Sequence, residues 1–372
     1  MMKRIKMLDV ARGIAIIGTL GTNVWLFAGI QQMGAEDIDQ VSSLFWIAYA
    51  LGGIITNGKF LGLLTIMFGI GMQLKYASYK RRGLPFYKLY AWSMILLFID
   101  GLLHFVFVFE YDVLMSYAVT GLFVAYIIQK SDKTIWITMI SAGVVHLAYQ
   151  VYTTLIAPRN SLIANSTTGI LTNTTWMEQV SHRLTNFIAL RGEAITIIPM
   201  NIFLFLVGVL LVRKGLLKMD KASIKLQNRL MLWGLAIGFP LTLASIVLTG
   251  LDRYIAAPVV AIGYLGLVFW IDRHQFFPRI QQALSRIGKM ALSCYILQNI
   301  LASVLFYSWG FGLAQAHSLF VIAAIWLGIV LFMMAFSYVW LKFFERGPFE
   351  LFWTYLSNLP TKRYTNTIKR EI

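Results

Sequence analysis

An aspartate and a histidine stand four residues apart inside a long apolar run. They are Asp100 and His104, in ILLFIDGLLHFVFVF. On a helix this spacing places both side chains on one face, where the carboxylate can accept a hydrogen bond from the imidazole. A carboxylate so placed fixes the histidine tautomer and raises its basicity, which suits a general base or a proton relay. The alternative is a structural pair that joins helices. We favour the functional interpretation, because ionisable groups inside a membrane are costly.

A second aspartate completes the candidate catalytic set. Asp112 ends the short turn FEYD, which also contains Glu110. As the N-cap of the next helix, Asp112 would accept hydrogen bonds from the first turn and interact favourably with the helix dipole. That cap alone would explain Asp112. We nevertheless include it with Asp100 and His104 as a candidate catalytic residue.

The first apolar helix carries a candidate donor-binding site in the motif LDVARG, residues 8–13. Arg12, Thr19 and Asn23 lie within a narrow stripe of this helix, because seven and eleven residues are close to whole turns. Asp9 lies one turn before Arg12 and can pair with it. Arg12 is either a snorkelling residue near the cytoplasmic interface or an anion ligand for a phosphate or carboxylate. The candidate substrate- or donor-binding residues here are Asp9, Arg12 and Asn23.

Lys59 is a further buried charge, in TNGKFLGLLTIMFGIG. If residues 44–75 form one span, Lys59 lies near its centre and needs a partner such as Asp100 or Asp112. If the helix breaks at Gly58, Lys59 lies at the outer end of a shorter span. We favour the break, which makes Lys59 a candidate binding residue of an outer vestibule.

Glu193 opens a later span on the outer side and is the last candidate binding residue. Arg191 is close enough in sequence to form a local ion pair with it. Asp252 and Arg253 suggest a similar local pair at a tight outer turn. His146 lacks a local partner, and we interpret it as a polar packing contact.

The composition defines the class of protein. Of 372 residues, 58% are hydrophobic and 13% charged, with a mean hydropathy of +0.70, which predicts an all-α polytopic membrane protein. Cys294 is the single cysteine and the sequence holds no Cys/His cluster, so no metal site is predicted. The sequence also lacks a lysine-containing phosphate loop, HExxH and GxSxG, which argues against a soluble-type nucleotide enzyme or serine hydrolase.

The apolar runs and the basic residues together predict the topology. Taking the start as cytoplasmic, 26 Lys and Arg residues fall inside and only four outside. This asymmetry predicts ten spans with both termini in the cytoplasm, and it attributes the net charge of +16 to topology and contact with membrane lipid, not to nucleic acid. The predicted spans are 10–30, 44–75, 87–109, 112–129, 134–156, 194–213, 230–250, 253–271, 288–308 and 318–342.

The chain reads as one transmembrane domain, residues 1–342, followed by a cytoplasmic tail, residues 343–372. The exception to its short connections is a polar outer loop at about 157–193, in which Trp176 to Leu190 could form a short helix on the membrane. This loop is either an outer lid or a solvated connection between helix bundles, and we favour the connection.

Several stretches resemble the YeiB-like family of bacterial inner-membrane proteins (domain of unknown function 418). The resemblance extends over nearly the whole chain, in the same order. Its stretches are RIKMLDVARGIAIIGTLGTN (4–23), KFLGLLTIMFGIG (59–71), GLLHFVFVFEYDVLMSYAVTGL (101–122), FLVGVLLVRKGLL (205–217), IGKMALSCYILQNIL (287–301) and ERGPFELFWTYL (345–356).

The resemblance implies a bacterial inner-membrane location and a layout similar to transmembrane acyltransferases of the heparan N-acetyltransferase-like and acyltransferase-3-like families. Those proteins move an acyl group from a cytoplasmic donor, such as acetyl-CoA, to an acceptor across the membrane. Acyl-CoA would then be a co-substrate, with no permanently bound cofactor. Asn23 stands where acyltransferase-3-like proteins carry a histidine, so His104 would have to supply the base.

Two functions use the same residues. An acyltransferase would bind its donor with Arg12 and deprotonate a small-molecule hydroxyl or amine with His104. A proton-coupled transporter would line its path with Arg12 and the Asp100–His104 pair. A lipid-binding scaffold would leave the buried charges unexplained. The sequence favours the acyltransferase and makes no prediction of oligomeric state.

Overall fold

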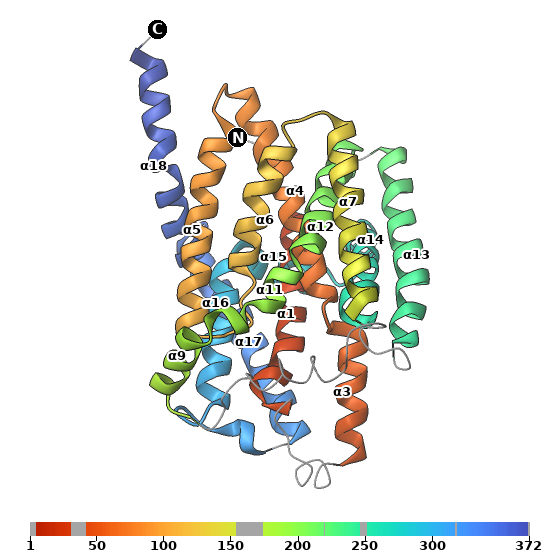
Figure 1. Ribbon diagram of the computed structural model, residues 1–372, viewed down its shortest axis with the longest axis vertical. Helices are drawn as coiled ribbons and strands as arrows, with labels where there is room; N and C mark the ends of the chain where they lie inside the picture. The colour runs from red at the N-terminus through yellow and green to blue at the C-terminus, as the bar shows by residue number, and fades with distance from the viewer. Residues whose placement is uncertain are drawn as a thin grey trace.

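The computed structural model describes residues 5–30, 42–153, 174–218, 220–245, 251–316 and 318–370. These ranges contain helices and no strand, and the helices form one bundle (Figure 1). Much of its outer surface is apolar, with side chains such as Ile137, Val144 and Leu331 more than half exposed. An apolar surface of this extent suits a lipid environment. The predicted all-α membrane class is therefore confirmed.

The first three described helices contain the break predicted at Gly58. They are α1 (Lys6–Phe27), α3 (Ser43–Thr56) and α4 (Lys59–Arg81). Gly58 is the N-cap of α4 and has a φ of +70°, a left-handed conformation that glycine adopts without steric cost. Across this break, α3 and α4 together form a candidate span of 39 residues, Ser43–Arg81.

The next three helices are α5 (Phe86–Phe107), α6 (Leu114–Ile127) and α7 (Asp132–Val151), of which α5 and α6 pack together as a hairpin. Residues 108–113 connect α5 to α6 without regular helix. They carry the backbone from the end of α5 back into the bundle, as Figure 1 shows.

A chain of short helices follows residue 173. It consists of α9 (Trp176–Thr185), α10 (Phe187–Leu190) and α11 (Gly192–Thr196), and it leads into α12 (Ile198–Arg213). The predicted helix over Trp176–Leu190 is confirmed, in two pieces. Thr175 begins α9 with a reciprocal capping box to Glu178, which satisfies two backbone N–H groups. The earlier part of the predicted outer loop, 157–173, lies outside the described residues.

The last part of the chain wraps around α1. A sharp bend of 88° separates α15 from α16, so α15 crosses the bundle rather than continuing the predicted span 288–308. The elements are α13 (Lys221–Ala244), the π-helix η4 (Asp252–Ala256), α14 (Ala257–Arg273), α15 (Pro278–Lys289), α16 (Ala291–Phe306), the 3-10 helix η5 (Leu313–Ala316), α17 (Leu319–Phe343) and α18 (Pro348–Arg370).

Helices α1 and α15 approach each other closely, and glycine permits the contact. A Cβ added to Gly13 would lie 2.1 Å from the carbonyl oxygen of Leu284, and one added to Gly288 would lie 1.7 Å from that of Asp9. Both distances are impossible for real atoms, so a side chain at either position would push the helices apart. The motifs LDVARG and IGKMALSCYILQNIL therefore meet at this contact.

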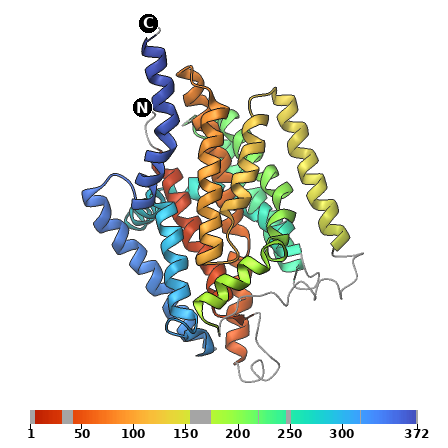
Figure 2. The ribbon, with the colours of Figure 1, turned by 60° about the vertical axis from the view of Figure 1, so that its left-hand side comes forward.

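The tail predicted after residue 342 is largely helical. The indole N–H of Trp92 in α5 donates a hydrogen bond to the carbonyl oxygen of Leu356 in α18, 2.9 Å away. The first part of α18 therefore packs on the bundle. Figure 2 shows α18 continuing past the end of the other helices, with α17 and α7 on opposite flanks.

Among the described residues, six helical segments are long and apolar enough to cross a membrane, or seven if α15 and α16 form one bent span. Helices α6 and α12 have 14 and 16 residues, which correspond to about 21 and 24 Å against a hydrocarbon core of about 30 Å. Ten spans and cytoplasmic termini remain predictions.

One end of the bundle carries the basic connections. The turns α4–α5, α6–α7 and α12–α13 lie together at the end where α18 emerges (Figure 1). They contain Arg82, Lys130 and Lys214 respectively. We call this the basic end.

An ion pair joins the break at Gly58 to the π-helix. Lys59 is fully buried, and its Nζ lies 2.5 Å from Oδ1 of Asp252, while Asn57 donates to Oδ2 at 2.9 Å. Lys59 also donates to the carbonyl oxygens of Gly53 and Asn57. The expectation that Lys59 lines an outer vestibule is wrong, and so are Asp100 and Asp112 as its partners.

We expect Asp252→Ala to lower the free energy of unfolding by about 3 kcal/mol, because it leaves the Lys59 ammonium buried without its carboxylate. Thermal unfolding of the detergent-purified protein would measure the loss. The double variant Lys59→Met, Asp252→Leu removes both charges and should recover most of the stability. Equal melting temperatures for Asp252→Ala and the unmodified protein would contradict the role given to this pair.

Candidate functional site

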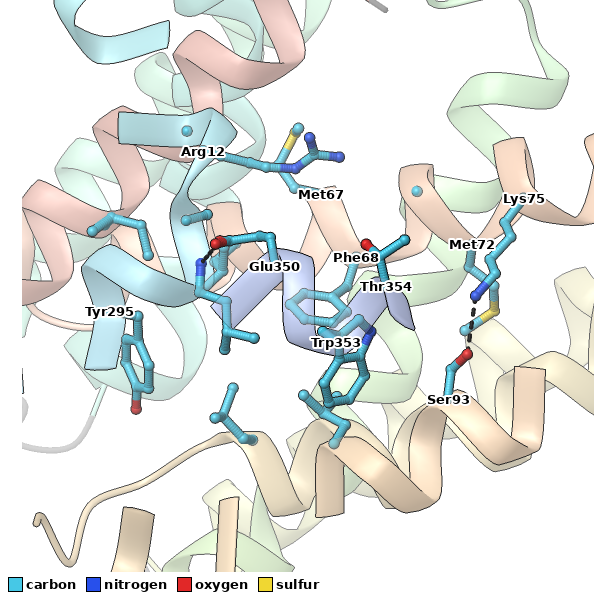
Figure 3. Close-up of a pocket in the computed structure, with 18 of the residues that line it drawn as sticks. Arg12, Met67, Phe68, Met72, Lys75, Ser93, Tyr295, Glu350, Trp353 and Thr354 are labelled. Carbon is cyan, nitrogen blue, oxygen red and sulfur yellow. Dashed lines mark hydrogen bonds between the residues drawn. The ribbon is translucent and has the colours of Figure 1, made fainter. Parts of the chain in front are cut away.

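A cavity of about 500 Å³ lies between α1, α4, α5, α18 and the α15–α16 bend (Figure 3). Four basic residues line it: Arg12 of α1, Lys75 of α4, Lys289 of α15, and Arg346 in the connection between α17 and α18. Arg346 is exposed, so the cavity reaches the surface of the protein there. Converging cations of this kind favour an anionic ligand.

The predicted pair in the first helix is confirmed. Nη1 of Arg12 lies 3.1 Å from Oδ1 of Asp9, whose side chain is buried. About a third of the Arg12 side chain remains exposed, and it projects into the cavity (Figure 3). Asp9 thus orients a guanidinium that still faces the cavity. Asn23 is buried further along α1 and does not line the cavity.

Lys75 forms the far side of the cavity from Tyr295 (Figure 3). Its Nζ donates to Oγ of Ser93 at 3.1 Å and lies 5.2 Å from the ring centre of Tyr90. In the sequence, Lys75 is one of the 26 basic residues predicted to be cytoplasmic, and no site role is predicted for it. The tertiary structure turns it into the cavity, because the last turns of α4 continue beside α5.

The walls between these cations are apolar. Met67, Phe68, Met72, Met94 and Trp353 line them. Trp353 and Phe68 lie near the middle of the cavity in Figure 3. The cavity therefore suits an elongated ligand that combines anionic groups with an apolar or flexible arm.

Helix α18 contributes a carboxylate that shapes the cavity. Glu350 Oε1 accepts hydrogen bonds from the backbone N–H groups of Leu292 at 2.7 Å and Ser293 at 3.1 Å, and Oε2 accepts one from the Ser293 hydroxyl. These donors belong to the first turn of α16. The backbone N–H groups of a first turn have no carbonyl acceptor within their own helix, and Glu350 supplies one. Glu350 thus fixes the start of α16, and with it Tyr295 one turn further on.

The inner end of the cavity is formed by Val113, Leu114 and Tyr295. The hydroxyl of Tyr295 donates to Oδ1 of Asp112 at 3.2 Å. Oδ2 of Asp112 accepts from the backbone N–H groups of Leu114 at 2.9 Å and Met115 at 3.3 Å. The predicted capping contacts are confirmed, although Asp112 stands one residue before the N-cap, Val113.

His104 lies beside this group, with its ring centre 5.2 Å from that of Tyr295. Its Nε2 is 2.9 Å from Nδ2 of Asn299, which belongs to α16. The expected Asp100–His104 hydrogen bond is absent from the described contacts. Oδ2 of Asp100 is buried without a hydrogen-bond partner among the described residues. Packing of α16 on α5 therefore supplies the partner of His104 instead of the local i, i+4 carboxylate.

Two buried arginines close the opposite side of this group. Arg183 of α9 is 2% exposed and donates to the carbonyl oxygen of Val106 at 3.2 Å. Arg191 donates to the carbonyl oxygens of Glu110 at 3.3 Å and Asp112 at 3.0 Å. The α9–α11 segment therefore covers the end of α5 and residues 108–113. The sequence predicts a local ion pair of Arg191 with Glu193, and no site role for Arg183.

The residues of the remaining predicted ion pairs have other partners in the structure. Glu193 pairs with Arg253 at 2.9 Å and accepts a hydrogen bond from the hydroxyl of Tyr254 at 2.8 Å. The expected Glu193–Arg191 and Asp252–Arg253 pairs are therefore wrong. Neither Glu193 nor Lys59 lines the cavity. The packing role expected of His146 is confirmed by its 2.8 Å contact with the carbonyl oxygen of Tyr254.

The site residues missed by sequence analysis share one recognisable signal. Tyr295, Asn299 and Ser303 are polar, recur every four residues in the apolar helix α16 and are all buried. A stripe of this kind on a membrane helix indicates a polar interior contact. Among the described residues, no group of three or more His, Cys, Asp and Glu side chains could hold a metal ion.

These features define a helical membrane protein with a cationic, apolar-walled cavity that ends at a buried Asp–Tyr–His group. Residues 211–360 match the family described as "Protein of unknown function (DUF418)". The predicted resemblance to the YeiB-like family is therefore confirmed. The matched region includes Tyr295, Asn299 and Glu350.

Three relatives match nearly the full chain. The "Uncharacterized protein YxaH" of Bacillus subtilis (strain 168) is 26% identical, covering 98% of this chain and 97% of its own. The "Uncharacterized protein YeiB" of Escherichia coli (strain K12) is 27% identical, covering 96% and 97%. The "Uncharacterized 39.9 kDa protein in amylase 3'region" of Bacillus acidopullulyticus is 22% identical, covering 99% and 97%. No solved structure matches the chain.

The carboxyl group of Glu110 makes the stability of this region dependent on pH. Glu110 lies between α5 and α6, outside both helices, and is buried; burial raises the pKa of its carboxyl to about 7, opposed by the charge of Arg183. The folded protein then holds a proton that the unfolded chain releases, so the free energy of unfolding falls as pH rises from about 4.5 to about 7.

We expect Glu110→Gln to flatten that fall, by up to about 3 kcal/mol over the whole window. Melting temperatures of the detergent-purified proteins between pH 4.5 and pH 7.5 would measure it. Glu345→Gln removes an exposed carboxylate and should leave the pH dependence unchanged. Parallel curves for Glu110→Gln and the unmodified protein would argue against a buried proton at Glu110.

Proposed function

We propose that this protein is an acyltransferase of the bacterial inner membrane, with its basic end in the cytoplasm. One observation carries the proposal: a cavity lined by four cations ends beside the buried group of Asp112, Tyr295 and His104. Anion binding and proton transfer are thereby brought to opposite ends of one cavity. The distance that separates Arg12 and His104 along the bundle is then bridged by an extended ligand.

The proposed donor is an acyl-CoA, bound only during turnover. Its phosphates would bind near Arg12, whose guanidinium can donate two parallel hydrogen bonds, and near Lys75, Lys289 and Arg346. Its flexible arm would lie between the apolar walls and carry the thioester toward Tyr295. Asp9 orients Arg12 in this proposal. Asn23, Lys59 and Glu193 do not line the cavity, so this proposal gives them no part in donor binding.

The proposed acceptor is a small molecule or lipid with a hydroxyl or amine. In acyl transfer the acceptor must lose a proton as it attacks the thioester carbonyl carbon. The Asp112–His104 region would manage that proton, because it is the polar group at the inner end of the cavity. Asp100, with a buried oxygen that lacks a described partner, is a further acid–base candidate nearby.

A second candidate function, proton-coupled transport, has one observation in its favour. Glu110, Arg183 and Arg191 continue the buried charges from the inner end of the cavity toward the α9–α11 segment. A carrier would open this segment alternately with the basic end. It would move a small anion in sealed vesicles without consuming acyl-CoA.

We expect CoA and acetyl-CoA to raise the melting temperature of the purified protein, because a ligand that binds only the folded state stabilises it. At a concentration of 100 times the dissociation constant, the gain is about 2.7 kcal/mol. Lys289→Gln should reduce the shift, because it removes a cavity cation without breaking a described ion pair. The double variant Asp9→Asn, Arg12→Gln removes both charges of the buried pair and should reduce the shift further.

Arg279→Gln is the matched control, since it removes an exposed charge from α15 outside the cavity and should leave the shift unchanged. Equal shifts in all variants would place CoA elsewhere on the protein. No shift at millimolar CoA, with pH-dependent movement of a small anion in vesicles, would support the carrier.

A further inference from the structure

We propose that Tyr295 transfers the proton of the acceptor to Asp112, and that His104 positions the Tyr295 ring. This inference rests on the proposed acyl transfer and names the residue that faces the reacting atoms. Tyr295 is the member of the buried group that lines the cavity, whereas neither His104 nor Asp112 does. A substrate in the cavity can therefore contact the Tyr295 side chain directly.

The contacts of Asp112 orient it toward this tyrosine. Two backbone N–H groups at the start of α6 bind Oδ2 and leave Oδ1 facing the hydroxyl of Tyr295 at 3.2 Å. Arg191 holds the backbone carbonyl of Asp112 at 3.0 Å. The carboxylate is thus held in one position before any ligand arrives, which is the requirement for an efficient proton acceptor.

The contacts of His104 fit a positioning residue better than a base. Nδ2 of Asn299 is an amide donor, so in this arrangement Nε2 of His104 accepts its hydrogen bond and the lone pair is occupied. The imidazole ring lies tilted at 34° to the Tyr295 ring, in van der Waals range of it. Asn299 and His104 together fix the rotamer of Tyr295.

A lone pair of the acceptor oxygen or nitrogen attacks the thioester carbonyl carbon, while its proton passes to Oη of Tyr295 and the Tyr295 proton passes to Oδ1 of Asp112. The tetrahedral intermediate then collapses, the carbon–sulfur bond breaks, and CoA leaves as a thiolate. The proton returns from Asp112 through Tyr295 to the sulfur, which restores the carboxylate and the phenol.

The test uses the full-length protein in vesicles of phosphatidylethanolamine and phosphatidylglycerol, with acetyl-CoA as donor and release of the CoA thiol as readout. Tyr295→Phe should lower kcat by about 100-fold or more, with little change in KM for acetyl-CoA or in the melting shift with CoA. Asp112→Asn should lower kcat similarly. A solvent deuterium effect on kcat, present in the unmodified protein, should diminish in Tyr295→Phe.

Tyr117→Phe is the matched control. Tyr117 is equally buried and its hydroxyl contacts Thr65 and Leu61, outside the cavity, so its loss should leave kcat unchanged. Thiol release by Tyr295→Phe at the unmodified rate would refute the relay alone. A Tyr295→Phe protein that no longer shifts with CoA would refute it too, because Tyr295 would then serve binding. Absence of thiol release by the unmodified protein would refute acyl transfer itself, and the relay with it.

Discussion

The buried carboxylate of Asp112 is the constraint on which this arrangement depends. A carboxylate inside a membrane protein must be matched by donors, because it cannot be solvated by lipid. Its two oxygens bind the start of α6 and the hydroxyl of Tyr295, and Arg191 binds its backbone carbonyl. Three separate parts of the chain, residues 108–113, α16 and the α9–α11 segment, are thereby fixed to one another.

The same requirement explains the division of charge along the cavity. The cavity cations Arg12 and Lys289 line the end that reaches the surface, where water lowers the cost of keeping them charged. At the inner end, the Asp112 carboxylate and the two buried arginines are matched by protein groups. Arg183 and Arg191 bind backbone carbonyls instead of a ligand. The proposed recognition of an anion and the proposed transfer of a proton would therefore take place in different electrostatic surroundings.

The cavity exists because α15 does not continue into α16. The glycine contact of α15 with α1 holds α15 across the bundle, and the 88° bend then directs α16 along it. Glu350 of α18 stabilises the new helix start by accepting its first N–H groups. Three of the stretches that resemble the YeiB-like family, around Arg12, Tyr295 and Glu350, converge on this one space.

The sequence by itself determined the features that depend on near neighbours. Its apolar composition defined the class. Gly58 marked the helix break, and the spacing of LDVARG predicted the pair of Asp9 with Arg12, because both follow from helix geometry over one or two turns. The partners of buried charges were decided by tertiary structure. His104 meets Asn299, 195 residues away, and Lys59 finds its carboxylate 193 residues away. A sequence shows which groups need partners, but only helix packing determines which faces meet.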